Sequence, residues 1–200
     1  ICSGLVGSEM CIRDRTGGTQ ADSFNIVATD ISADLLTING GSSAGSAQYD
    51  TLTGPGVNAT WTVNSQNGGS LVNSDAGGVF NVEFTDIENL QGGAGDDTFA
   101  FLNVDVDGFV DGGAQATVAG DTVDLSNQVT VVFNVAGGLT GRTNFESVNG
   151  NWNSATSSGN SRIIGANVAN NWSIDGDNSG SVGSLVVTNF NNLPGGTAVS

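Results

Sequence analysis

A recurring Gly-Gly motif is the feature that most constrains the fold of this chain. A Gly-Gly pair, a spacer of variable length, and then Asp, Thr or Ser and an apolar residue recur in four copies, GGTQADSF, GGSSAGSAQYDTL, GGAGDDTF and GGAQATVAGDTV, which begin at Gly17, Gly40, Gly92 and Gly112. Repetition of this kind is typical of stacked architectures, in which neighbouring units bury one another's apolar faces. This Gly-Gly unit therefore predicts a stack of similar turns and strands and not a single globular core.

Two further units recur in the same chain. The Thr unit, which is Thr, Asp or Asn, an apolar residue, two polar residues, an apolar residue and a glycine turn, occurs as TDIENLQGG, TNFESVNGN and TNFNNLPGG at 85–93, 143–151 and 188–196. The Trp unit pairs WTVNSQNGGSL at 61–71 with WSIDGDNSGSV at 172–182. We expect Trp61 and Trp172 to occupy equivalent buried places, each with a hydrogen-bonded indole N–H.

The residues between the turns favour strands. Apolar and polar residues alternate, as at Phe99 and Phe101, and this period of two is typical of a strand with one buried face. Helical spacing is not sustained, and each of the 31 glycines would cost about 1 kcal/mol relative to Ala inside a helix. The sequence therefore predicts an all-β protein with almost no helix.

The spacing of the glycine corners indicates how the strands are arranged. Corners at Leu90, Val110 and Val135 lie 20 and 25 residues apart, which is close to one turn of a parallel β-solenoid. Glycine in such a fold takes up turns with φ > 0, and Asn, Ser and Thr satisfy backbone groups at the corners. We predict a parallel β-helix (β-solenoid), and a tandem β-sandwich is the alternative because it also has short, regularly spaced strands.

The first 15 residues differ from the rest. They hold both cysteines, Cys2 and Cys11, and the only methionine. The stretch VGSEMCIRDR resembles translated sequencing-adapter sequence, so residues 1–15 are interpreted as a non-native segment. Residues 16–200 are interpreted as a single β-solenoid repeat region, an internal fragment of a longer protein.

Composition excludes most kinds of chemistry. The chain has 20 acids, 4 bases and no histidine, for a net charge of −16, and this charge disfavours nucleic acid and anionic membrane surfaces as partners. No apolar run is long enough to span a membrane as a helix. Without His, Lys or cysteine beyond residue 15, catalytic triads, Schiff-base lysines and thiolate metal sites have no residues to build them. We therefore expect a protein that is not an enzyme.

Carboxylate chemistry is what remains, so the acids need individual attention. Asp105, Asp107 and Asp111 could share one face of an extended segment, and Asp86 and Glu88 alternate in the same way. Solvated or corner-facing positions explain both sets more simply than catalysis. The alternative function is a carboxylate-dependent, polysaccharide-active β-helix enzyme or a carbohydrate-binding module.

One segment imitates a calcium-binding helix–loop–helix motif. DGDNSG at 175–180 matches the opening of an EF-hand loop, but the twelfth position is Val186, where a bidentate Glu is needed. Its counterpart in the first Trp unit, NSQNGG at 64–69, carries no acid. A turn is therefore expected at both places.

GGAGDDTFA at 92–100 fits the nonapeptide GGxGxDxUx and so resembles haemolysin-type (RTX) calcium repeats. GGTQADSFN at 17–25 fits with one departure, at Gln20. The resemblance implies that Asp97 and Asp22 are calcium ligands and that the phenylalanines two residues after them are core residues. The candidate residues for weakly bound calcium are therefore Asp22, Gly93, Gly95, Asp96 and Asp97. Because the flanking nonapeptides do not match, the alternative is a tight turn that Asp97 caps.

The chain as a whole resembles the degenerate solenoid regions of large secreted RTX-type or filamentous-adhesin proteins of bacteria. That resemblance implies a non-catalytic structural or adhesive repeat segment at the cell surface or outside the cell. The expected partners are surface glycans, or the surface of a host or neighbouring cell. The only expected cofactor is weakly bound calcium.

Overall fold

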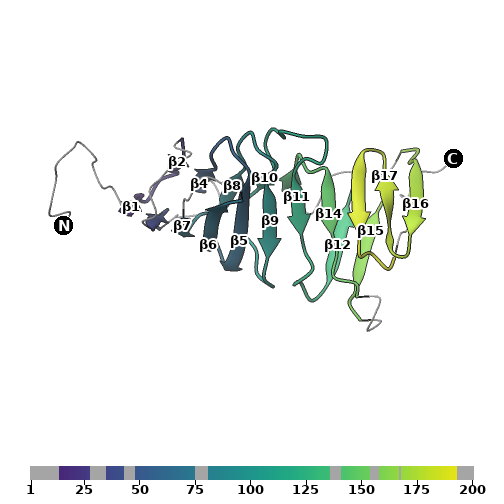
Figure 1. Cartoon of the computed structure of the whole chain (residues 1–200). Helices are drawn as coiled ribbons and strands as arrows, with labels where there is room; N and C mark the ends of the chain where they lie inside the picture. The colour runs from purple at the N-terminus through teal and green to yellow at the C-terminus, as the bar shows by residue number, and fades with distance from the viewer. Residues whose placement is uncertain are drawn as a thin grey trace.

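The computed structural model describes residues 14–27, 35–42, 48–74, 81–135, 141–153, 158–166 and 168–192. Within these ranges the chain forms β-strands and no helix, which confirms the all-β class. Figure 1 shows the strands side by side along an elongated molecule, in approximate chain order from the N-terminal end to the C-terminal end. Residues 1–13 of the adapter-like segment lie outside the described residues, whereas Asp14 and Arg15 lie in the first strand.

The described strands form three sheets. The large sheet has the order β1 (Asp14–Thr16), β3 (Leu36–Asn39), β7 (Asn81–Thr85), β6 (Gly68–Asn73), β5 (Ala59–Ser65), β9 (Thr98–Phe101), β11 (Thr122–Asp124), β14 (Ser147–Asn149), β18 (Leu185–Thr188), β17 (Ser179–Val182) and β16 (Trp172–Gly176). The second sheet has the order β13 (Arg142–Thr143), β10 (Val110–Asp111), β8 (Asn89–Gln91), β4 (Thr51–Thr53) and β2 (Ser23–Asn25). The smallest sheet pairs β12 (Val131–Asn134) with β15 (Ser161–Ile164).

Parallel pairing dominates these sheets. From β1 to β4 the chain alternates between the large and the second sheet, and each strand pairs in parallel with the next strand of its own sheet. Eleven of the fifteen strand pairs among the described strands are parallel. The large sheet is nevertheless mixed, because it also contains antiparallel pairs. The parallel β-helix therefore stays a prediction.

The predicted corner spacing is right once and wrong once. Leu90 of β8 is the parallel partner of Val110 of β10, as the interval of 20 residues predicts. The next partner of Val110 is Arg142 and not Val135. Val135 follows β12 and donates its N–H to the Ile164 carbonyl at 2.9 Å, so it belongs to the smallest sheet. Between β11 and β13 the chain forms β12, which belongs to a third sheet. A constant number of residues per turn could not predict this additional strand.

The antiparallel pairs lie within the two Trp units and between each unit and the strand that follows it. Together, each unit and that strand fold as a three-stranded meander, β5–β6–β7 in the first copy and β16–β17–β18 in the second. The hairpin turns contain Asn67 and Asn178, whose φ angles of 55° and 59° lie in the left-handed region that Asn tolerates. This confirms that 64–69 and 175–180 form turns.

Glycine follows several strands because a neighbouring backbone segment of the same chain lies too close to leave room for a side chain. A Cβ on Gly92 would lie 1.8 Å from the Gly112 carbonyl oxygen, and a Cβ on Gly112 would lie 2.1 Å from that of Asn144. Asn144 ends this row with a φ of 56°. The same arrangement recurs in the row Gly17, Gly40 and Asp86, where Asp86 has a φ of 52°. In each of these two series of stacked corners, glycine occupies the first two corners, and an Asn or Asp of a Thr unit occupies the last.

Aromatic rings form the centre of the core. Trp61 is fully buried and stacks on Phe99, with ring centroids 5.0 Å apart and planes 11° apart. The edge of Phe84 completes the contact at 6.1 Å. Within the described structure the Nε1 of Trp61 has no hydrogen-bond partner, so the predicted indole hydrogen bond is wrong. Trp172 is less deeply buried than Trp61, but it packs against the same core.

Candidate functional site

The predicted calcium turn joins β8 to β9 and contains Gly93, Gly95, Asp96 and Asp97. Asp97 is buried, and both of its carboxylate oxygens accept backbone hydrogen bonds. Its Oδ2 accepts from the Gly93 N–H (3.0 Å), and its Oδ1 accepts from the Ala59 N–H (2.8 Å) at the start of β5. Asp97 therefore caps the turn, as the alternative interpretation of this motif predicts.

Asp96 faces a different segment from Asp97. Its Oδ1 accepts from the backbone N–H groups of Ala116 and Thr117, both at 2.8 Å, and its Oδ2 accepts from Thr117 Oγ1 at 2.5 Å. The Thr117 hydroxyl is the main reason that the pKa of Asp96 lies below its usual value. Asp96 thus holds the β10–β11 connection against the β8–β9 turn.

The glycines of the turn are explained by close packing. A Cβ on Gly93 would lie 1.6 Å from the Pro55 carbonyl oxygen, and a Cβ on Gly95 would lie 2.4 Å from the Asn58 nitrogen. Any side chain at either position would displace the segment ahead of β5. Packing against this neighbouring backbone therefore requires glycine at both positions, whether or not an ion is bound.

Asp22 has the same local role as Asp97 but lies at another corner. Its Oδ2 accepts from the Gly18 N–H at 2.7 Å, four residues earlier, as Asp97 accepts from Gly93. Asp22 precedes β2 in the second sheet, whereas Asp97 precedes β9 in the large sheet, so the two are not brought together. In the described ranges, no three His, Cys, Asp or Glu side chains are grouped so that they could hold a metal ion. The calcium site stays a prediction.

The acids of the Gly-Gly and Thr units form two rows that sequence reasoning missed. Each acid lies directly before a strand, and the strands that follow are neighbours in one sheet. The first carboxylate row, ahead of the second sheet, consists of Asp22, Asp50 and Glu88. The second carboxylate row, ahead of the large sheet, consists of Asp97, Asp121 and Glu146.

After the first acid of each row, each acid accepts a hydrogen bond from the backbone N–H of the acid before it. In the first row Asp22 donates to Asp50 Oδ1 at 2.6 Å, and Asp50 donates to Glu88 Oε2 at 2.9 Å. In the second row Asp97 donates to Asp121 Oδ1 at 2.6 Å, and Asp121 donates to Glu146 Oε2 at 2.8 Å. The carboxylates therefore continue the parallel hydrogen-bond ladder past the ends of the strands.

Two acids of the second carboxylate row, Asp97 and Asp121, have raised pKa values. Burial raises the pKa of Asp97 to about 6 and that of Asp121 to about 7. The negative charges of Asp97, Glu146 and Asp96 raise the pKa of Asp121 further. Asp121 is fully buried, and its Oδ2 has no hydrogen-bond partner within the described structure. Because an unpaired buried charge is costly, Asp121 favours the neutral carboxylic acid below about pH 7.

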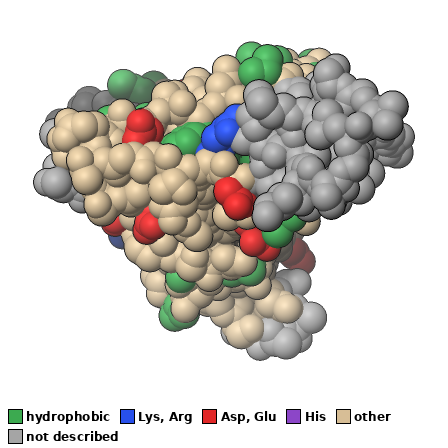
Figure 2. Space-filling view, turned by 90° about the vertical axis from the view of Figure 1, so that its left-hand side faces the viewer, with side chains coloured by type: hydrophobic (Ala, Val, Ile, Leu, Met, Phe, Trp, Pro, Cys, Tyr) green, Lys and Arg blue, Asp and Glu red, His purple; other side chains and the backbone are tan. Residues whose placement is uncertain are grey.

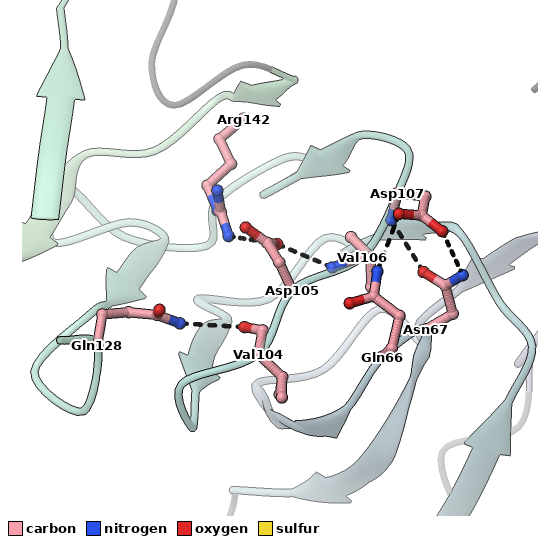
Figure 3. Close-up of polar contacts among 8 residues, drawn as sticks. All are labelled: Gln66, Asn67, Val104, Asp105, Val106, Asp107, Gln128 and Arg142. Carbon is pink, nitrogen blue, oxygen red and sulfur yellow. Dashed lines mark hydrogen bonds and ion pairs between the residues drawn. The ribbon is translucent and has the colours of Figure 1, made fainter. Parts of the chain in front are cut away.

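The alternating acids that could have formed a catalytic face have separate partners. Asp105 forms an ion pair with Arg142 at 2.7 Å, and the Arg142 guanidinium lies 4.1 Å from the centre of the Phe101 ring. Asp107 accepts from Gln66 and Asn67, as Figure 3 shows. These contacts turn Asp105 and Asp107 towards different elements.

The other alternating acids, Asp111, Asp86 and Glu88, also lie at corners between strands. Asp111 Oδ1 accepts from the Gly113 N–H at 3.0 Å and from Asn144 Nδ2 at 2.7 Å. Asp86 is an exposed residue with a left-handed backbone, whereas Glu88 is buried within its row. On the face drawn in Figure 2, acidic side chains are scattered among uncharged polar surface.

One hollow in the described structure has a lining that mixes polar and apolar side chains. It has a volume of about 500 Å³ and lies beside β12, β13 and the β17–β18 turn. Phe133, Phe145 and Leu185 line it together with Arg142, and its lining contains no carboxylate. A glycosidase needs two carboxylates across its cleft, and the described residues that line this hollow include none.

Comparisons with known proteins give no relative. No protein-family model matches the chain, and neither the curated proteins nor the solved structures contain a significant match. The described residues contain no helix that is long and apolar enough to cross a membrane.

Proposed function

We propose that this chain is a non-catalytic repeat segment of a parallel β-solenoid in a secreted or cell-surface bacterial protein. Its role is to extend the parent protein and to present or adhere through its surface. The observation that carries this proposal is that the carboxylates of both rows accept backbone hydrogen bonds at the corners. Carboxylates engaged in this way join neighbouring turns of the stack, which is a structural role.

The strand pairing supports the solenoid part of the proposal. In the second sheet β2, β4, β8, β10 and β13 pair in parallel and in chain order. A β-sandwich of the immunoglobulin type consists of antiparallel sheets, so this order favours the solenoid over the sandwich. The acidic composition favours partners that carry no negative charge, such as neutral surface glycans.

The test is to incubate the purified chain with a panel of neutral and acidic bacterial and host polysaccharides, and to measure retention and release of reducing ends in the same samples. We expect retention of the chain on at least one surface glycan or on intact cells, and no release of reducing ends. Release of reducing ends that is lost in Asp107→Asn, whose side chain is exposed, would favour the carboxylate-dependent enzyme instead. Asp111→Asn provides a second variant of the same acidic segment.

A further inference from the structure

The two copies of the Trp unit are built alike. Trp61 is the antiparallel partner of Leu71 in the first meander, and Trp172 is the antiparallel partner of Val182 in the second. The third strand of each meander, β7 or β18, pairs in parallel with an earlier strand of the large sheet, β3 or β14. The two meanders are therefore equivalent in their internal pairing and in their attachment to the sheet.

The support beneath the two tryptophans is also equivalent. Cβ atoms built on Gly54 and Gly165, each seven residues before a Trp, would lie 2.8 Å and 3.1 Å from the Cζ2 atoms of Trp61 and Trp172. Thr51 of β4 pairs in parallel with Asn89, and Arg162 of β15 forms a parallel bridge with Asn192. The second copy thus repeats the surroundings of the first copy and not the meander alone.

The two copies differ at the outer edge of the first strand. β5 pairs in parallel with β9, so that Trp61 is opposite Phe99 and Val63 is opposite Phe101. β16 is the terminal strand of the large sheet as described, at the C-terminal end of the molecule in Figure 1. The position that β9 occupies beside β5 has no counterpart beside β16 among the described strands.

Burial follows this difference. Val63 is 0% exposed, and the equivalent Ile174 is 62% exposed. Trp61 is fully buried, and the equivalent Trp172 is half-buried. A strand edge that exposes unpaired backbone groups and large apolar side chains is a template for a further strand.

We propose that β16 is a docking edge for one further strand of the β9 type, added in parallel. The occupant is an extended segment with a Gly-Gly turn, an Asp, and then Thr, an aromatic residue, a small residue and a second aromatic residue. Its first aromatic ring lies on Trp172 as Phe99 lies on Trp61, and its second covers Ile174 as Phe101 covers Val63. The register of the β5–β9 pair supplies this assignment. The inference does not depend on the proposed adhesive function.

The direct test uses the full chain and a synthetic peptide with the sequence of residues 92–103, GGAGDDTFAFLN. Amide NMR of the labelled protein during titration with the peptide should show shifts at Trp172, Ile174 and their neighbours on β16. The same peptide with Phe99→Ala should lose at least about tenfold in affinity, because the ring that stacks on Trp172 is missing. Equal binding of both peptides, or shifts confined to other strands, would overturn the proposal.

Two protein variants distinguish pairing at the β16 edge from nonspecific hydrophobic binding. Ile174→Lys places a charge on the face that the added strand buries, and it should weaken binding of the peptide by about tenfold or more. Ser173→Lys is the matched control, because Ser173 points to the opposite face of the same strand, and it should leave binding unchanged. Equal loss in both variants would contradict the assigned face. A concentration-dependent dimer that Ile174→Lys abolishes would assign the edge to a second copy and overturn the proposed occupant.

A chain with a covalently attached strand makes the test independent of weak binding. By alignment of the Thr units, Ser200 corresponds to Asp97, so the sequence TFAFLN is fused directly after Ser200. The fused strand should raise the midpoint of thermal unfolding and protect Trp172 from fluorescence quenching by acrylamide. The fusion AFAALN, which lacks both aromatic rings, should do neither. Equal behaviour of the two fusions would overturn the proposal.

Discussion

Single side chains carry the hydrogen bonding at the corners of this protein. A parallel ladder ends where the strand ends, and the next backbone N–H then needs an acceptor from elsewhere. Asp121 and Glu146 supply that acceptor to Asp97 and Asp121 in turn. At the same corners glycine lets the neighbouring backbone approach, as the 1.8 Å between a Cβ built on Gly92 and the Gly112 oxygen shows. A corner therefore depends on one acid and one glycine.

Gly92→Ala should destabilise the protein by about 1–3 kcal/mol or more, because a Cβ there would overlap the Gly112 carbonyl oxygen at 1.8 Å. Gly56→Ala is the matched control, since a Cβ at Gly56 would meet nothing nearer than the Ala94 Cβ at 3.8 Å. Urea unfolding of the two variants and the parent measures the difference. Equal stability of both variants would show that the Gly92 corner relaxes at little cost.

Asp121 should make stability depend on pH. Its folded pKa of about 7 lies above the value of about 3.9 for an unfolded chain, so the folded state binds the proton more tightly. The contribution of this group is therefore fully present below about pH 4 and is lost as the pH rises through about 7. Asp97, with a pKa of about 6, acts in the same direction.

Asp121→Asn should flatten this dependence, because the amide resembles the neutral acid and cannot ionise. The free energy of unfolding, measured in urea from pH 4 to pH 8, should fall less steeply in the variant than in the parent. Relative to the parent, the variant should therefore gain stability towards pH 8. Parallel curves for the two proteins would contradict a shifted Asp121.

At the scale of elements, the same strand behaves differently according to its neighbour. β5 and β16 share a sequence pattern and an internal hairpin, but β9 covers only β5. The sequence of a strand thus sets which face is apolar, and the neighbouring strand sets whether that face is buried. Trp61 and Trp172 are a natural pair for measuring this difference.

Trp61→Ala should cost about 3–5 kcal/mol, because a fully buried ring that stacks on Phe99 leaves a cavity when it is removed. Trp172→Ala should cost clearly less, since Trp172 is only half-buried in the described structure. Thermal and urea unfolding of the two variants provide the comparison. An equal cost would indicate that Trp172 is as well covered as Trp61.

The β8–β9 turn should not need calcium in order to fold. Both Asp97 oxygens already accept backbone hydrogen bonds, so an ion must compete with the Gly93 and Ala59 N–H groups. Calorimetric titration should show binding in the millimolar range at best, with Asp97→Asn as the control. Submicromolar affinity, or unfolding on addition of a chelator, would show that the site is stronger than its hydrogen bonds indicate.

At the scale of the whole molecule, the sequence predicted local features such as turns and strands, but it did not predict which distant strands pair with each other. The Gly-Gly unit correctly predicted the turn before β9, and period two correctly predicted strands with one buried face. The sequence did not reveal that Glu88 and Glu146 end the carboxylate rows, because an acid at a corner looks the same whether it faces water or the next backbone N–H. Nor could it show that Val110 pairs with Arg142, since nothing local marks the detour through β12.

The parallel stacking of the second sheet predicts which surface positions can be cross-linked. Thr53 of β4 is the partner of Gln91 of β8, which in turn is the partner of Asp111 of β10. Adjacent strands lie about 4.8 Å apart, within reach of a disulfide, whereas positions two strands apart lie beyond the limit of about 7 Å. In a chain with Cys2→Ser and Cys11→Ser, the pair Thr53→Cys and Gln91→Cys should form a disulfide on mild oxidation, and the pair Thr53→Cys and Asp111→Cys should not. Electrophoresis of protease digests without reductant would reveal the linked peptides. Efficient linkage of the second pair, or none of the first, would contradict the parallel order β4–β8–β10.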